Sequence, residues 1–449
     1  MKVSIIVPLH NSRKYISECM DSIINQTLDD IEIICIDSGS DETSKIIQSY
    51  ACKDKRIKYI YDSNSSYGYK INKGIVLAKG KYIAIVESDD YIRNDMMQIL
   101  YELAENNNVD FVKSDFKKCI DLNNERIEFG IEQLPNLELY NRVINIQEEP
   151  VIKEYIGYNI WVGLYLKEFL VSNSIFLNES EGASYQDTGF SVLITLIAQR
   201  VYFSNHQLYR YRIDNNDSSV KSQLKYKCII NEFHWLKEQM NIKNLKKSED
   251  IIFYKDKKLI SYLWNFQRLL PEYQIKFLNE IKEEMKNEFP DDSFYISSAS
   301  SEKLQIINIL KGSTEEAVKL KQNGTTAKRY LENALKIISN KKSVVIFGAG
   351  VYGKALIEMI DILQKGKVVA ICDNDIKKHD KELFKLKIED PRNAALKFKD
   401  AFFIIANKEY YYEIRKQLEH YGIQPDNIYA IKEIPSKYML LEAIAEIYC

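Results

Sequence analysis

Three carboxylates stand close together in the segment Glu87-Ser88-Asp89-Asp90, directly after the apolar run Tyr82–Val86. The run predicts a buried parallel strand, and ligands of parallel sheets bind beyond the carboxyl ends of the strands. Carboxylate oxygens suit hard divalent cations, and Mg²⁺ or Mn²⁺ commonly bridges them to substrate phosphates. The alternative is that the acidic residues only lead the chain into a helix near Asn94, where negative charge suits the helix dipole. Taken alone, the segment favours the helix start.

A second acidic segment, Asp37-Ser38-Gly39-Ser40, follows the apolar run Ile31–Ile36. Because parallel strands end at the same edge of a sheet, we expect both segments to line one edge. Between them, residues 65–74 predict a glycine-containing loop that enters a helix, whose free N–H groups suit an anion. Lys70 or Lys73 would add positive charge, although an ordinary loop with surface lysines is the alternative. The shared edge favours a combined metal and phosphate site over a simple turn.

Strand and helix patterns alternate through the first part of the chain, which predicts a three-layer α/β domain with a mostly parallel sheet. The predicted strands are Val3–Val7, Ile31–Ile36, Ile57–Tyr61 and Tyr82–Val86, and the predicted helices are Lys14–Asn25, Glu42–Ala51, Lys70–Ala78 and Asn94–Asn107. A length of 449 residues predicts more than one domain. We place the first domain at 1–220, a helical connector region at 221–341 and a small α/β domain at 342–449.

The order of short motifs resembles that of family 2 glycosyltransferases with the GT-A fold, of the bacterial capsule and lipo-oligosaccharide type. The resemblance covers about the first half of the chain. The segments that carry it are Val3–Asn11, Ser22–Thr27, Asp37–Ser40, Asn72–Gly74, Ala78–Ile83 and Glu87–Asp90. It implies an inverting transfer of a sugar from a nucleotide-diphospho-sugar to a hydroxyl of a surface-glycan acceptor, with Mn²⁺ or Mg²⁺ as cofactor.

The resemblance also implies roles for single residues. Asp89 would be the direct metal ligand and Asp90 a weaker candidate, while Glu87 stands where the family usually has Asp. Ser38 replaces the second acidic residue of the nucleotide pocket, which puts the usual uracil recognition in doubt. The implied nucleotide-sugar-binding set is Pro8, Asn11, Asp37, Ser38, Asn72, Glu87, Ser88 and Arg212.

An inverting displacement needs a base that deprotonates the acceptor hydroxyl. The family commonly has an acidic pair where this chain has Gln186-Asp187, so the resemblance implies Asp187 as the base. The alternative for Asp187 is a helix N-cap. Arg212 would neutralise the leaving diphosphate, and an Arg–Asp pair that braces a turn is equally compatible with the sequence. Trp161 is more typical of a packing residue than of a sugar platform.

The segment Gly348-Ala349-Gly350-Val351-Tyr352-Gly353 follows the apolar run Val344–Phe347. A second run, Val368–Cys372, ends at Asp373. Glycines Gly348, Gly350 and Gly353 with this acid form the pattern of a dinucleotide-type fingerprint. The unit resembles compact Rossmann-like nucleotide-binding domains attached to sugar acyltransferases and some glycosyltransferases. Nucleotide-sugar binding, regulation of the transferase and a packing or dimer role without ligand all stay open.

Composition excludes some classes of function. A net charge of −2 gives no general attraction to nucleic acid or to an anionic membrane. Seven scattered cysteines indicate a reducing compartment, and no segment approaches the roughly 20 apolar residues that span a bilayer. We expect a cytoplasmic protein, with peripheral association at the inner face of the membrane and homo-oligomers left open.

The expected partners are a nucleotide-diphospho-sugar donor and an oligosaccharide or lipid-linked glycan acceptor. Two other functions compete with this one. The first is a nucleotide-sugar oxidoreductase or epimerase centred on the glycine-rich unit at Gly348. The second is a non-catalytic assembly subunit that keeps the transferase shape.

Overall fold

The computed structural model describes residues 1–122, 125–215, 222–289, 343–350, 353–354, 356–357, 360, 367–407 and 410–430. The chain divides into two compact units. The first comprises residues 1–120 and 128–321, and the second comprises residues 121–127 and 322–449. Each unit is described by itself.

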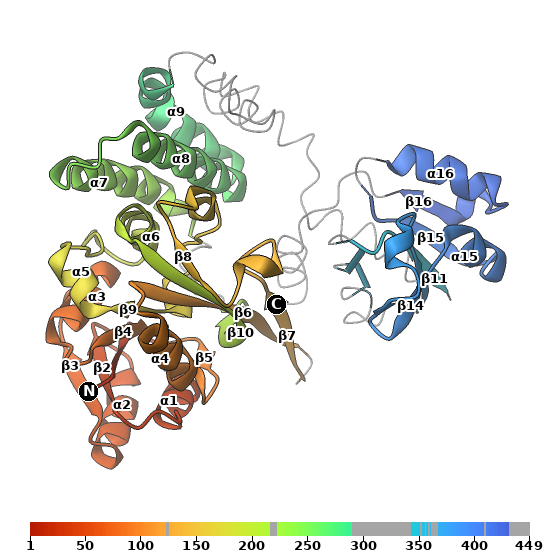
Figure 1. The fold of residues 1–449 in the computed structure, drawn as a ribbon. Helices are drawn as coiled ribbons and strands as arrows, with labels where there is room; N and C mark the ends of the chain where they lie inside the picture. Colours follow the sequence, from red (N-terminus) through yellow and green to blue (C-terminus); the bar gives the residue numbers. More distant parts are fainter. Residues whose placement is uncertain are drawn as a thin grey trace. The chain divides into compact units, whose positions relative to one another are not determined.

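The first unit is built on a large twisted sheet (Figure 1). Its spatial order is β3-β2-β1-β4-β9-β6-β10-β5, with β7 paired to β6 and β8 paired to β10. Strands β1 to β4 run parallel, while β9 lies antiparallel between β4 and β6. The strands are β1 Val3–Leu9, β2 Ile31–Asp37, β3 Ile57–Tyr61, β4 Tyr82–Ile85, β5 Tyr91–Ile92, β6 Phe111–Leu122, β7 Glu125–Ile131, β8 Val143–Asn145, β9 Gly163–Leu166 and β10 Arg200–Arg212.

The helices of the first unit cover both faces of this sheet (Figure 1). They are α1 Ile16–Ile24, α2 Thr43–Lys53, α3 Tyr67–Leu77, α4 Met96–Asn107, α5 Lys167–Ser172, α6 Gln186–Ile197, α7 Cys228–Ile242, α8 Ser248–Arg268 and α9 Pro271–Glu288. The strands and helices expected up to Asn107 are all present, with ends displaced by a few residues. The α/β fold class with a mostly parallel sheet is confirmed.

Side chains of β1 point alternately into two cores. Ile6 packs with α3 and α6 in one core, whereas Ile5 and Val7 pack with α1 and α4 in the other. This alternation follows from the two-residue period of a strand, and a strand covered on both faces is apolar throughout. All seven residues of β1 are buried. The continuous apolar run is therefore explained by a central strand that helices cover on both sides.

Helices α7, α8 and α9 share the core of the sheet domain rather than forming a separate layer. Phe233, Tyr262 and Phe277, one from each helix, belong to the same buried cluster as Ile6 of β1. The fully buried ammonium of Lys258 pairs with Glu284 and Glu288 at 2.5 and 2.7 Å, which links α8 to α9. The described part of the expected connector, residues 222–289, is helical and extends the first unit.

The second unit contains a smaller sheet with the order β13-β14-β12-β11-β15-β16. Strands β14, β12, β11, β15 and β16 run parallel, and β13 forms an antiparallel edge hairpin with β14. The elements are β11 Val344–Phe347, β12 Val368–Cys372, β13 Glu382–Leu383, β14 Leu386–Glu389, α15 Pro391–Lys397, β15 Phe402–Ile405, α16 Tyr411–His420 and β16 Ile428–Ala430. The two strands expected here are present, whereas the helix expected after Gly353 lies partly outside the described residues.

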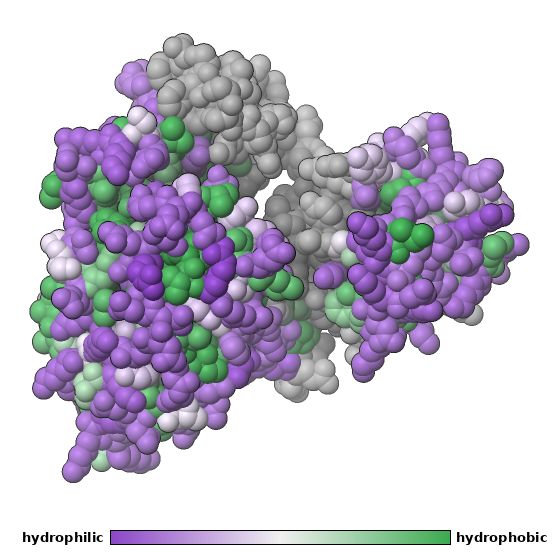
Figure 2. Space-filling view, viewed as in Figure 1, coloured by the Kyte–Doolittle hydropathy of each residue, from purple (hydrophilic) through white to green (hydrophobic). Residues whose placement is uncertain are grey.

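No helix within the described residues is long and apolar enough to cross a bilayer. In the view of Figure 2, hydrophobic residues form small separate groups among hydrophilic ones.

Candidate functional site

The carboxyl ends of β1, β2 and β4 bring both acidic segments to one edge of the sheet. Parallel pairing sets Leu9 opposite Asp37, and Pro8 opposite Ile36. The loops beyond the strands are tied together, because Asn11 Oδ1 accepts the Ser40 N–H at 2.9 Å. A hydrogen bond of 2.6 Å also joins the hydroxyls of Ser12 and Ser88. Of the residues expected to bind the donor, Asn11 and Ser88 thus help to build the loops of this edge.

Asp37 and Ser38 hold the end of β2 in shape. The Asp37 carboxylate is 1% exposed and accepts hydrogen bonds from the Gly39 N–H at 2.8 Å and the Tyr59 hydroxyl at 3.0 Å. Lys70 of α3 donates to Ser38 Oγ and to the Leu9 carbonyl, both at 3.0 Å, and burial lowers the pKa of Lys70. A lysine that is 3% exposed thus places a positive group between β1 and β2.

Asn72 of α3 fastens a distant segment to the site. Its amide nitrogen donates to the Leu177 carbonyl and to Glu179 Oε1, both at 2.9 Å, and its oxygen accepts the Leu177 N–H at 2.8 Å. Its polar atoms therefore serve to position the chain that leads to Asp187.

The carboxylate of Glu87 is hydrogen-bonded to Tyr67, whose hydroxyl donates to Glu87 Oε1 at 2.5 Å. Burial raises the pKa of Glu87 to about 8, although the Tyr67 hydrogen bond opposes this shift. The negative charges of Asp89 and Asp187 raise it further. Glu87, Asp89 and Asp187 therefore lie within electrostatic reach of one another, although Asp187 is far away in the sequence.

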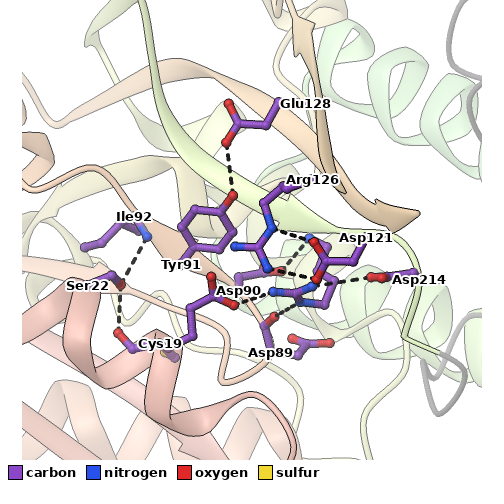
Figure 3. Close-up of polar contacts among 12 residues, drawn as sticks. Cys19, Ser22, Asp89, Asp90, Tyr91, Ile92, Asp121, Arg126, Glu128 and Asp214 are labelled. Carbon is purple, nitrogen blue, oxygen red and sulfur yellow. Dashed lines mark hydrogen bonds and ion pairs between the residues drawn. The ribbon is translucent and has the colours of Figure 1, made fainter. Parts of the chain in front are cut away.

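Asp89 and Asp90 are neighbours with different surroundings (Figure 3). Asp90 is 1% exposed, and its two oxygens accept the Tyr209 hydroxyl at 2.8 Å and the Arg212 N–H at 2.7 Å. Burial raises the pKa of Asp90 well above its usual range. Asp89 is partly exposed, and its Oδ2 accepts the Asn215 amide at 2.8 Å. The geometry favours Asp89 over Asp90 as a metal ligand, because Asp90 is committed to joining β10 to the loop after β4.

The described residues contain no group of three or more His, Cys, Asp or Glu side chains arranged to hold a metal ion. A magnesium site needs only one or two carboxylates when substrate phosphates and water complete the coordination. The partly exposed carboxylates of Asp89 and Glu87 are the side chains at this edge that fit such a site.

Arg212 is held inside the protein, with 1% of its side chain exposed. Its guanidinium donates to Glu18 Oε2 at 2.5 Å and to the Asp89 carbonyl at 3.0 Å, and it lies 3.6 Å from Asp214. It also stacks over the Tyr15 ring at 4.6 Å. These contacts favour the bracing role that the sequence left open. Residues 216–220 of the same segment lie outside the described residues.

Asp187 stands in the first turn of α6, so the N-cap alternative does not hold. The cap residue is Tyr185, which has a φ of 69°, and Asp187 Oδ1 accepts the Thr188 N–H at 2.9 Å. Burial raises the pKa of Asp187 to about 6, and the ammonium of Lys113 opposes that shift. Gln186 organises the preceding loop, since its amide contacts Ser180, Gly182 and Ser184.

Two buried groups near Asp187 were not singled out in the sequence. Lys113 of β6 is fully buried, donates to the Gly157 carbonyl at 2.8 Å and has its pKa lowered to about 7, mainly by burial. Glu232 of α7 is 1% exposed and accepts the Gly189 N–H at 3.1 Å. A Cβ at Gly189 would lie 2.2 Å from Glu232 Oε1, so this contact requires a glycine. An isolated lysine in a strand and a glutamate in a helix give no sequence signal.

Trp161 packs inside the protein, as expected. Its ring stacks on Tyr211 with centroids 5.0 Å apart and meets Phe116 edge-on at 4.9 Å. It is 7% exposed, so it offers no platform for a sugar.

In the second unit, Asp373 fastens the glycine-rich loop to the end of β12. Its Oδ2 accepts the Ala349 N–H at 2.8 Å and the Lys378 ammonium at 3.0 Å. Gly348 has a φ of 116°, and a Cβ at Gly353 would lie 1.7 Å from the Gly348 carbonyl, whereas Gly350 faces open space. Two of the three glycines are therefore required by the backbone. Residues 351 and 352 of the loop lie outside the described residues.

Comparison with known proteins adds family evidence for each unit. Residues 4–162 match the family described as glycosyl transferase family 2. They form a family 2 glycosyltransferase domain. This domain supplies both acidic segments of the site, whereas Asp187 lies beyond the matched residues.

The sequence matches to two relatives are longer than residues 4–162 and therefore extend beyond the family match. The uncharacterized glycosyltransferase EpsJ of Bacillus subtilis is 33% identical over 232 residues, which are 51% of this chain and 65% of EpsJ. The match thus spans less than two thirds of EpsJ. The cholesterol galactosyltransferase of Borreliella burgdorferi is 28% identical over 326 residues, which are 68% of this chain and 90% of that protein.

The crystal structure of Staphylococcus aureus TarS residues 1–349 matches with a TM-score of 0.42 and 19% identity, covering 74% of this chain and 86% of that one. Residues 340–429 match a different family, described as C2185-like, N-terminal. Nucleotide binding by the second unit stays a prediction.

Proposed function

We propose that the protein is an inverting glycosyltransferase that moves a sugar from a nucleotide-diphospho-sugar to an acceptor hydroxyl. The observation that carries the proposal is the proximity of Asp187 to the acidic edge of the glycosyltransferase domain. Burial is the main cause of the raised pKa values of Glu87 and of the Tyr67 phenol. The negative charge of Asp187 lies close enough to raise both pKa values further. A base and a phosphate-binding edge beside one another are what a displacement at a sugar carbon requires.

Asp187 takes the proton of the acceptor hydroxyl as that oxygen attacks. A base with a pKa near the working pH combines an ionised ground state with good proton affinity, and a pKa of about 6 meets this condition. Thr188 holds one carboxylate oxygen of Asp187, so the other is the one available for the acceptor. A divalent cation on Asp89, with Glu87 nearby, would supply positive charge for the departing diphosphate when bound.

The pH dependence of transfer is expected to report Asp187. Transfer requires the ionised carboxylate, so kcat/KM should fall about tenfold per pH unit below pH 6 and level off above it. Lys113→Met removes the positive charge that opposes the shift, so its acidic limb should move to higher pH. Profiles of wild type and Lys113→Met, measured with saturating Mn²⁺, test this. A limb near pH 4 in both proteins would contradict the role of Asp187.

We further propose that the second unit is a Rossmann-like accessory domain that binds a nucleotide. Numbered along the chain without the edge hairpin strand β13, its parallel strands lie in the order 3-2-1-4-5, as in doubly wound dinucleotide-binding sheets. The glycine-rich loop follows the first of these strands and is tied to the second through Asp373. If this unit were instead the centre of an oxidoreductase, it would have to bind a nicotinamide cofactor. The substitution Gly350→Val would then have to abolish that binding.

Nucleotide-sugar binding can be measured before the acceptor is known. We expect one member of a panel of UDP- and GDP-sugars, with Mn²⁺, to raise the melting temperature by about 5 °C at a hundredfold excess over its Kd. The same panel with EDTA serves as the control. A chain whose melting temperature responds to no nucleotide-sugar, and which hydrolyses none, would refute the transferase proposal and favour the assembly subunit.

A further inference from the structure

Aromatic rings from three separate segments lie around the start of α6, the helix whose first turn holds Asp187. Tyr158 precedes β9, Tyr185 starts α6 and Trp264 belongs to α8, and all three are partly exposed. Burial raises the pKa of both phenols to about 12, and the charge of Asp187 contributes to both shifts. Trp264 meets Tyr185 edge-on, with ring centroids 6.0 Å apart. The two phenols therefore lie within electrostatic reach of the proposed base, and Trp264 packs against the nearer one in the chain, Tyr185.

One face of α8 fixes these rings in place. Ser261, Trp264, Asn265 and Arg268 follow the i, i+3, i+4, i+7 spacing that lines one face of a helix. The Tyr158 and Ser261 hydroxyls share a hydrogen bond of 3.0 Å. The Tyr185 hydroxyl donates to Asn265 Oδ1 at 2.7 Å and accepts from Arg268 Nε at 2.9 Å. The Arg268 guanidinium also lies over the Trp264 ring at 5.7 Å.

The backbone of Tyr185 has a φ of 69°, a left-handed conformation that residues other than glycine rarely adopt. Such a conformation costs free energy and persists where the surroundings hold it, as they commonly do at functional sites. Here both polar contacts of its phenol come from α8. The helix thus holds the residue that introduces the first turn of α6, where Asp187 lies.

We propose that the partly exposed Trp264 and Arg268 of α8, with Tyr158 and Tyr185, form the subsite for the acceptor sugar. The buried Ser261 and Asn265 hold the two phenols in place. The inference rests on the proposed function, since Asp187 must lie within hydrogen-bond reach of the acceptor hydroxyl. A pyranose presents an apolar C–H face and a rim of hydroxyls. Partly exposed aromatic rings suit the first, and the partly exposed guanidinium of Arg268 suits the second. The acceptor is therefore a pyranoside that stacks against Trp264.

The test separates acceptor binding from donor chemistry. The donor is the nucleotide-sugar that stabilises the chain, and the acceptor probes are cellotriose, maltotriose, chitotriose and lactose. Trp264→Ala should raise the KM of the best acceptor at least about tenfold, the equivalent of one lost stacking contact. Acceptor-free hydrolysis of the donor and the donor KM should stay unchanged, and Trp264→Phe should restore most of the acceptor affinity.

Ile251→Ala is the matched control, because Ile251 is an exposed apolar residue near the opposite end of α8. Should Trp264→Ala fail to fold, Trp264→Leu keeps an apolar side chain of intermediate size without the aromatic face and is expected to give the same rise in KM. An unchanged acceptor KM, or equal losses of hydrolysis and transfer, would overturn the subsite. So would a wild type that hydrolyses its donor but uses none of the four acceptors. A wild type that neither binds nor hydrolyses any nucleotide-sugar would refute the proposed function instead.

Discussion

Replacing Asp187 by asparagine is expected to lower the rate of sugar transfer by about three orders of magnitude, within the range for loss of a general base. Asparagine keeps the shape of the side chain and an oxygen that can accept the Thr188 N–H, so the helix start should be preserved. The amide cannot take a proton from the acceptor. Initial rates of transfer at saturating donor and Mn²⁺, with melting temperatures of both proteins, measure the effect.

Glu181→Gln is the matched control for this variant, since Glu181 is an exposed carboxylate in the loop before α6. Its transfer rate should equal that of wild type. Near-normal turnover by purified Asp187→Asn would show that another group is the base, while the metal and donor assignments would be unaffected.

Replacing Asp89 by alanine is expected to reduce transfer at least about a hundredfold, because the variant loses the carboxylate that would hold the cation against the diphosphate. The stabilisation of the chain by nucleotide-sugar with Mn²⁺ should vanish as well. Asp89 is partly exposed, so the melting temperature without ligand should change little. Transfer assays and thermal melts with and without Mn²⁺ measure the two effects separately.

Asp90→Ala provides the contrast. Its loss leaves the buried Tyr209 hydroxyl and Arg212 N–H without their acceptor, at a cost of about 3 kcal/mol in the free energy of unfolding. Activity should be lost through instability. If Asp90→Ala were stable and Asp89→Ala retained Mn²⁺-dependent binding of the nucleotide-sugar, the metal assignment would have to move to Asp90.

Much of the fold was predictable because hydrophobic periodicity is a local property. The runs at Val3–Val7 and Ile31–Ile36 are buried on both faces in the structure, and a strand buried on both sides has to be apolar at every position. The same logic predicted that the acidic segments after β2 and β4 share an edge. The extent of the first unit was harder to predict, because the α7–α9 pattern shows which residues are buried but not against which core.

The sequence by itself determined the succession of strands and helices, the family of the glycosyltransferase domain and the candidate carboxylates Asp37, Asp89 and Asp187. Only the tertiary structure gave a physical reason for preferring Asp89 to Asp90, because it committed Asp90 to Tyr209 and Arg212. It also placed Arg212 inside the protein, brought Lys113 and Glu232 near the base and bound the face of α8 to Tyr185. The physical reason is the range of the interactions. Secondary structure follows from neighbouring residues, whereas the partners of a buried charge or ring come from segments far apart in the chain.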